Sequence, residues 1–155
     1  MRRLKKDKKG VMELPLKLIV MFLLLGSFIP LGLLQYKSMK RQRYEQRVKE
    51  ELNRLVFTGQ ELSQMGNGSS RSLKLDLKGS AFGKLDHVHF GRPLNNSLEY
   101  KFSWKSSSNY LVVDDPYFRF DVENESFSLG SGTYTLKIIH IQNEESSSIS
   151  LEIEQ

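Results

Sequence analysis

Residues 14–34 read LPLKLIVMFLLLGSFIPLGLL, an apolar run interrupted by one charge at Lys17. The run is 21 residues long, and an α-helix needs about 20 apolar residues to cross the hydrocarbon core of a bilayer. A cleaved secretory signal has a shorter core and ends in small residues of the A-x-A type, whereas this run contains no alanine. The sequence therefore predicts a membrane helix that the protein keeps.

Residues 1–10, MRRLKKDKKG, form a basic leader with six basic residues and one acid. The whole chain has 23 Lys and Arg and 18 Asp and Glu, a net charge of +5, so without the leader 17 of each sign would remain. The sequence pI of 9.4 therefore belongs to the leader and indicates no nucleic-acid-binding surface. We expect no nucleic-acid partner.

The junction Lys8-Lys9-Gly10, placed directly before the apolar helix, resembles the class III signal peptide of archaeal type IV pilin-like proteins. The resemblance is strongest over residues 5–36. It implies that a prepilin-type leader peptidase cuts between Gly10 and Val11 on the cytoplasmic side, and that the retained helix then packs in a filament core. Glu13 would be the third mature residue, whereas the family usually has its glutamate at the fifth.

The function implied by this resemblance is structural. The chain would be a subunit or minor component of an archaeal type IV pilus-like surface filament, in contact with membrane lipid and with copies of itself or other pilins, in motility, adhesion or DNA uptake. Glu13 would take part in assembly. Pro30, which lies near Gly26 and Gly32, is expected to kink or loosen the helix, and pilin helices often carry a comparable proline-containing weak point.

The side of the membrane on which the C-terminal part lies is not decided by flanking charge, because residues 37–51 also carry six basic residues. Three N-x-S sequons, at Asn67, Asn95 and Asn124, fall in predicted turns and are candidate glycosylation sites. They favour an extracellular C-terminal domain. The chain has no cysteine, which excludes the small disulfide-rich secreted class.

The helix is expected to continue past the membrane, over residues 11–57, because residues 35–57 lack Pro and Gly. An apolar face follows this extension, formed by Tyr44, Val48, Leu52, Leu55 and Val56. It needs a partner, either the C-terminal domain, identical helices or a coiled-coil stalk, and it is short for a heptad zipper. Gly59 is expected to end the helix, with a flexible linker at 58–72.

Residues 73–155 are expected to form a small antiparallel, immunoglobulin-like β-sandwich after the long helix, which makes the fold class mainly β. Period-two alternation and turn signals predict about seven strands, at residues 73–77, 82–90, 98–104, 109–113, 118–122, 134–138 and 149–153. Tyr134, after Gly130-Ser131-Gly132, is either a tyrosine corner or an ordinary strand aromatic.

The sequence offers little chemistry. His87 and His89 share one face of a strand, but a zinc site needs a third ligand, and Asp114-Asp115-Pro116 is typical of a turn. No phosphate loop, cysteine nucleophile or G-x-S-x-G elbow is present. We expect no enzyme, cofactor, metal or small-molecule substrate. Exposed Tyr110 and Tyr117, with the Ser- and Asn-rich loops, are candidates for an adhesive tip.

A different class of protein remains open: a permanently anchored extracellular β-sandwich that keeps its leader and binds a partner such as the cell-surface layer or an archaellum motor component. Archaellum stator proteins also combine one N-terminal helix with a sandwich, so the fold does not separate the two hypotheses. A cytoplasmic sandwich on an anchor of opposite orientation would leave the three sequons unmodified.

Overall fold

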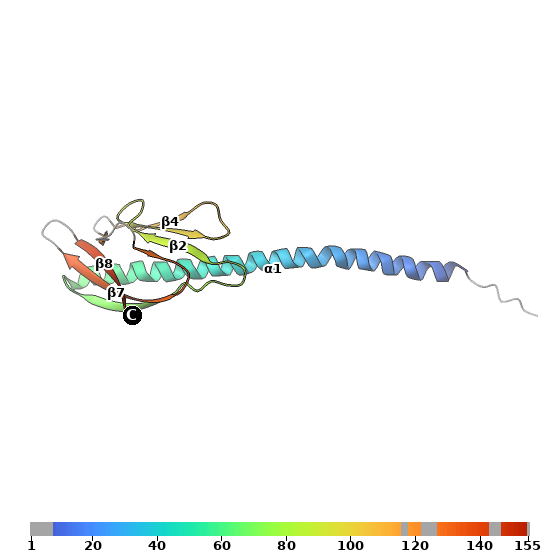
Figure 1. Cartoon of the computed structure of the whole chain (residues 1–155), viewed down its shortest axis with the longest axis horizontal. Helices are drawn as coiled ribbons and strands as arrows, with labels where there is room; N and C mark the ends of the chain where they lie inside the picture. The colour runs from blue at the N-terminus through green and yellow to red at the C-terminus, as the bar shows by residue number, and fades with distance from the viewer. Residues whose placement is uncertain (1–7, 116–117, 122–126, 143–146, 155) are drawn as a thin grey trace, which may run out of the picture. The chain divides into compact units, whose positions relative to one another are not determined.

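The computed structural model describes residues 8–115, 118–121, 127–142 and 147–154, with side chains from residue 15 onward. The chain divides into two compact units, Met1–Lys40 and Arg41–Gln155. A single helix, α1 (Lys8–Met65), contributes to both, and the strands all lie in the second unit (Figure 1).

The strands form two four-stranded sheets. The first has the order β1-β7-β8-β5, with β1 at Ser70–Asp76, β7 at Thr133–Gln142, β8 at Ser147–Glu154 and β5 at Phe120–Asp121. The second has the order β4-β3-β2-β6, with β4 at Asn109–Val112, β3 at Ser97–Phe102, β2 at Leu85–Phe90 and β6 at Ser128–Leu129. All pairings are antiparallel except β5 with β8. The prediction of a long helix followed by a β-sandwich is confirmed.

The order of the strands departs from that of immunoglobulin domains in one respect. The C-terminal hairpin β7–β8 shares a sheet with the first strand, whereas immunoglobulin constant domains place their last two strands with the third. The Tyr134 ring packs against Gly132, with its hydroxyl oxygen 3.0 Å from where a Cβ would stand. Among the described residues this hydroxyl makes no hydrogen bond to the backbone, so Tyr134 is a strand aromatic and not a tyrosine corner.

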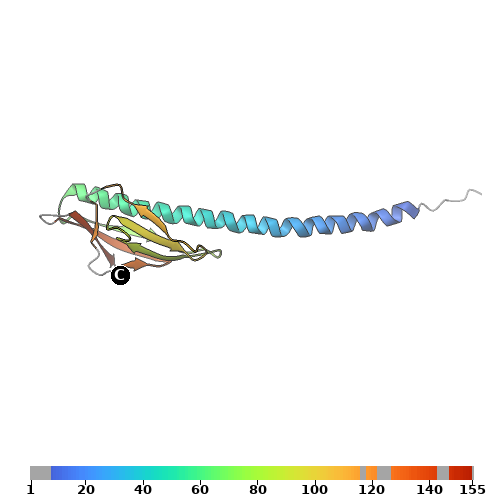
Figure 2. The ribbon, with the colours of Figure 1, turned by 90° about the horizontal axis from the view of Figure 1, so that it is seen from above.

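The core lies between the two sheets and the second half of α1. The sheets and this half of the helix run side by side in both ribbon views (Figures 1 and 2). Tyr44, Val48, Leu52, Leu55 and Val56 are all buried there. The prediction that this apolar face packs on its own domain is therefore confirmed. The alternation in β3 is confirmed as well, since Leu98, Tyr100 and Phe102 are buried while the residues between them are partly exposed.

The predicted end of the helix was wrong. α1 continues to Met65, so most of the expected linker at 58–72 is the last part of the helix followed by the start of β1. Gly59 lies inside the helix and allows a close approach: a Cβ there would stand 2.8 Å from Cε2 of Phe118. The last helical residue is Met65, and Gly66 follows it. The φ of Gly66 is 100°, the left-handed conformation typical of a glycine after a helix C-terminus.

Three smaller boundaries also differ. α1 begins at Lys8 and so includes the last residues of the predicted leader. β2 begins at Leu85 and not at residue 82, because Ser80 and Gly83 first form an isolated bridge. β6 was not predicted, because two residues are too few to show an alternation.

Candidate functional site

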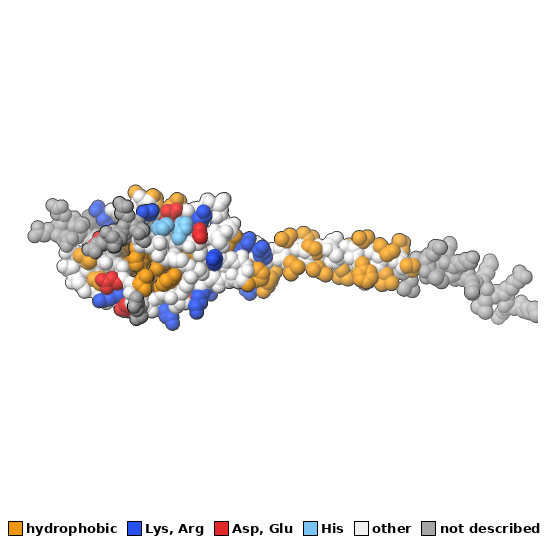
Figure 3. Space-filling view, in the orientation of Figure 1, with side chains coloured by type: hydrophobic (Ala, Val, Ile, Leu, Met, Phe, Trp, Pro, Cys, Tyr) orange, Lys and Arg blue, Asp and Glu red, His pale blue; other side chains and the backbone are white. Residues whose placement is uncertain are grey.

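The N-terminal half of α1 presents apolar side chains on all sides. The large apolar residues from Leu16 to Leu34 are between 48% and 71% exposed, and they cover the surface of the helix in Figure 3. By length and composition this part of α1 meets the requirement for a membrane span, and a signal sequence meets the same requirement. A helix that is apolar all round is stable only in hydrocarbon or among other helices.

Polar groups within the apolar run are few. The Ser27 hydroxyl donates to the Leu23 carbonyl at 2.9 Å, which satisfies it inside the helix. Apart from the adjoining residues and the backbone of the helix itself, no described atom lies within 4 Å of where a Cβ would stand on Gly26 or Gly32. Small residues of this kind let helices approach closely in a membrane, so both positions leave room for a neighbouring helix.

Pro30 does not interrupt the helix, because α1 is continuous through both Pro15 and Pro30. Proline lacks an N–H, so the carbonyl of Gly26, four residues earlier, loses its helical hydrogen bond. The helix therefore lacks a main-chain hydrogen bond within the apolar run. This is the place where the sequence predicted a weak point in the helix.

The predicted cleavage junction lies in the first turns of α1. Gly10 and Val11 are helical, as is Glu13. The side chains of residues 8–14, and therefore any contact of the Glu13 carboxylate, lie outside the described residues.

The two described sequons differ in their surroundings. Asn67 is exposed in the turn after α1, and its side-chain oxygen accepts a hydrogen bond from the Gln142 N–H at 2.9 Å. Asn95 is exposed between β2 and β3, but the serine of its sequon, Ser97, is fully buried and its hydroxyl bonds to Leu94. Asn124 lies outside the described residues.

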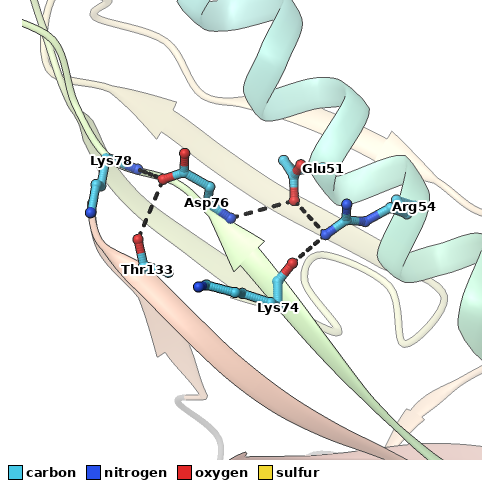
Figure 4. Close-up of a pocket in the computed structure, with 6 residues that line it drawn as sticks. All are labelled: Glu51, Arg54, Lys74, Asp76, Lys78 and Thr133. Atoms are coloured by element: carbon cyan, nitrogen blue, oxygen red, sulfur yellow. Dashed lines mark hydrogen bonds and ion pairs between the residues drawn. The ribbon is translucent and has the colours of Figure 1, made fainter.

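The second half of α1 closes the free edge of β1, at the shallow pocket drawn in Figure 4. A guanidinium N–H of Arg54 donates to the Lys74 carbonyl, and the Glu51 carboxylate accepts from the Asp76 N–H at 3.4 Å. Arg54 and Glu51 are themselves 3.0 Å apart. Glu51 and Arg54 therefore satisfy the strand edge and each other.

Two further helix side chains extend this contact. The Tyr44 hydroxyl donates to the Leu77 carbonyl at 2.9 Å, and Arg47 donates to the Lys78 carbonyl at 2.6 Å. An uncovered strand edge is a template for pairing with other chains, and natural proteins cover it. Sequence reasoning missed this arrangement, because the pattern that identified the apolar face of α1 says nothing of the polar residues beside it.

His87 and His89 share the outer face of β2, as predicted, with ring centroids 4.5 Å apart. Burial of the imidazole, helped by the neighbouring His87 and Arg92 charges and opposed by Glu99, lowers the pKa of His89. Its Nδ1 is buried and has no hydrogen-bond partner among the described residues. Within that same part of the chain, no group of three or more His, Cys, Asp or Glu side chains is placed to hold a metal ion.

Of the two candidate adhesive tyrosines, Tyr110 shares a cross-strand row with Glu99 and His89. Tyr110 is 55% exposed on β4, a strand at the edge of its sheet, and Val112 on the same strand and Leu94 nearby are also exposed. Tyr117 lies outside the described residues.

Comparisons with protein families, with curated proteins and with solved structures found no match to this chain. The apolar N-terminal helix followed by a β domain is nevertheless the architecture of pilin-like proteins.

Proposed function

We propose that this protein is a type IV pilin-like structural subunit, or minor component, of an archaeal surface filament. Its basic leader, residues 1–10, is removed by a prepilin-type peptidase, and assembly proceeds through the apolar helix. The protein acts without catalysis or a small-molecule substrate, and its β domain lies outside the cell. Its partners are membrane lipid and other pilin subunits.

One observation carries this proposal: a single helix joins a fully exposed apolar half to a half built into the core of a β domain. The exposed half must be covered by lipid or by other helices, because water around so much apolar surface is costly. With the leader present, six basic residues and one acid precede the apolar run and oppose its lateral packing in an apolar medium.

A second candidate is the permanently anchored binding module, which keeps its leader and recognises a partner such as the surface layer. The exposed Tyr110 and Val112 on the edge strand β4 favour it, because apolar groups gathered on a soluble domain often mark a binding surface.

The experiment that separates these proposals is the intact mass and N-terminal sequence of the protein from native membranes. We expect a mature chain that begins at Val11. Gly10→Val should leave the precursor uncut, while Gly32→Val, the same change away from the junction, should be processed normally. A wild-type chain that begins at Met1 would overturn the pilin proposal and leave the anchored module.

A further inference from the structure

Basic side chains lie on helix residues 41–47 and on the segment that joins β1 to β2. The Arg41 Nε donates to the Phe82 carbonyl at 2.9 Å, and Arg47 donates to the Lys78 carbonyl at 2.6 Å. These bonds hold the segment between β1 and β2 against the helix, and they bring its lysines to the helix arginines. We call this group the basic collar: Arg41, Arg43, Arg47, Lys78 and Lys84.

The contacts that position the collar leave its charge in place. Arg41 and Arg47 bond to neutral carbonyls, and the Arg41 guanidinium lies 5.4 Å from the ring centre of Trp104. The nearest carboxylates are few: Asp76 lies 4.0 Å from Arg47 and is exposed, and Glu45 is already paired with Lys105 at 2.6 Å. The positive charge of the collar is therefore available to an external anion.

The collar also lies close along the chain to the apolar run. Arg41 follows Leu34 by seven residues, about 10 Å at the helical rise of 1.5 Å per residue. Lys37 and Lys40 lie between them, and Tyr36 is half exposed with the Lys40 ammonium 5.4 Å from its ring centre. Tyrosines and basic residues are typical of the level at which a membrane helix meets lipid headgroups.

We propose that the basic collar binds the headgroups of anionic lipids and holds the β domain at the membrane surface. This inference rests on the membrane-anchored part of the proposed function. Each Lys or Arg near an anionic surface strengthens such binding about fivefold. The attraction falls off within a Debye length, about 8 Å at physiological salt, so it depends on salt.

The full chain, reconstituted in phosphatidylcholine vesicles, carries its own probe. Trp104 is the only tryptophan and lies against Arg41 of the collar. Energy transfer from Trp104 is measured to a trace of dansyl-labelled phosphatidylglycerol and, in parallel vesicles, to dansyl-labelled phosphatidylcholine. We expect stronger transfer to the anionic lipid, and we expect the excess to vanish in 1 M salt, where the Debye length is about 3 Å.

The test variant is Arg43→Gln with Lys78→Gln and Lys84→Gln, since these three side chains are exposed and have no hydrogen bond or ion pair with any residue the structure describes. It removes three of the seven basic residues that the collar and residues 37–40 supply, so binding to anionic lipid should weaken about a hundredfold and most of the excess transfer should be lost. The matched control removes three charges elsewhere on the domain, by Arg71→Gln, Arg119→Gln and Lys137→Gln, and should keep the excess.

The outcomes separate this inference from the proposed function. Equal transfer to both labelled lipids, or an equal loss in the test variant and the control, would overturn the collar while leaving the anchor intact. No transfer to either lipid would show that the domain is not held at a membrane, and would overturn both. Excess transfer that is lost only in the test variant supports the collar.

Discussion

At the scale of single residues, Tyr44 joins the helix to both sheets. Its hydroxyl donates to the Leu77 carbonyl at 2.9 Å and accepts from the Leu85 N–H at 3.1 Å, and its ring meets that of Phe102 edge-on at 5.8 Å. The side chain is only 4% exposed. One residue therefore satisfies a main-chain group after β1 and another at the start of β2.

Tyr44→Phe should destabilise the protein. The change keeps the ring but leaves the Leu85 N–H without its partner in a buried setting, while the Leu77 carbonyl keeps the Ser131 hydroxyl at 3.1 Å, and the unsatisfied N–H costs about 1–3 kcal/mol. Denaturant unfolding of the full chain in detergent, followed by Trp104 fluorescence, measures the change. Tyr110→Phe is the control, because Tyr110 is exposed, and its free energy of unfolding should match that of the wild type. Equal effects of the two variants would contradict the role of Tyr44.

His89 makes stability depend on pH. Burial, together with the charges of His87 and Arg92, lowers its pKa in the folded protein from the ordinary 6.5, so below pH 6.5 the unfolded chain binds more protons than the folded one. The free energy of unfolding should therefore fall as the pH drops below about 6.5 and level off below the folded pKa. Urea titrations of the full chain between pH 8 and 5 measure this, and His89→Asn should make the decline shallower. An unchanged slope would exclude His89 as its source.

At the scale of elements, the second half of α1 is a structural part of the β domain. Its apolar face fills the core, and its polar residues Tyr44, Arg47, Glu51 and Arg54 bond to the backbone at the free edge of β1 and just beyond it. The last turns of the helix pack as closely, because Gly59 brings the backbone against the ring of Phe118.

Gly59→Val should destabilise the protein by about 1–3 kcal/mol, the usual cost of overfilling a packed core. A Cβ would stand 2.8 Å from Phe118 Cε2 and 3.6 Å from Ile149 Cγ1, and Phe118 is itself buried. Asn53→Val introduces the same side chain at an exposed position of α1 and should have little effect in the same unfolding measurement. Gly59 would prove to be replaceable if the two variants unfolded alike.

The sequence predicted these elements wherever the pattern extended over several residues. The alternation of Leu98, Tyr100 and Phe102 identified β3, and the spacing of Tyr44, Val48 and Leu52 identified the buried face of α1. The end of the helix was missed because a glycine in a helical pattern usually marks a stop, whereas Gly59 meets the tertiary contact with Phe118. The closure of the β1 edge depends on contacts between residues about 20 to 33 positions apart, which no local pattern contains.

At the scale of the whole molecule, the chain has two ends of different character. The apolar run requires lipid or neighbouring helices, while the β domain has a complete core of its own. The net positive charge lies at the N-terminal end, because the leader has six basic residues and one acid. The remaining chain has 17 basic and 17 acidic residues. Removal of the leader would therefore turn a basic precursor into a neutral subunit.

Glu13→Ala should leave membrane insertion intact and impair filament assembly. In the proposed filament, Glu13 pairs with the new α-amino group of an adjacent subunit, so that two charges are offset in an apolar setting. Membrane fractionation measures insertion, and sedimentation of sheared surface filaments measures assembly. Glu50→Ala is the control on the exposed face of α1 and should assemble normally. Normal assembly by the Glu13 variant would remove the proposed pairing.

The bonds from α1 to the backbone around β1 have a mechanical consequence. They are spread over helix residues 44–54 and reach the carbonyls of Lys74, Leu77 and Lys78. A pull on the helix along its axis therefore loads several bonds in shear at once, so that they share the force instead of breaking one by one. Since α1 runs without a break from the apolar run into the β domain, we expect tension on its N-terminal half to reach the domain without slack, as the proposed filament would require.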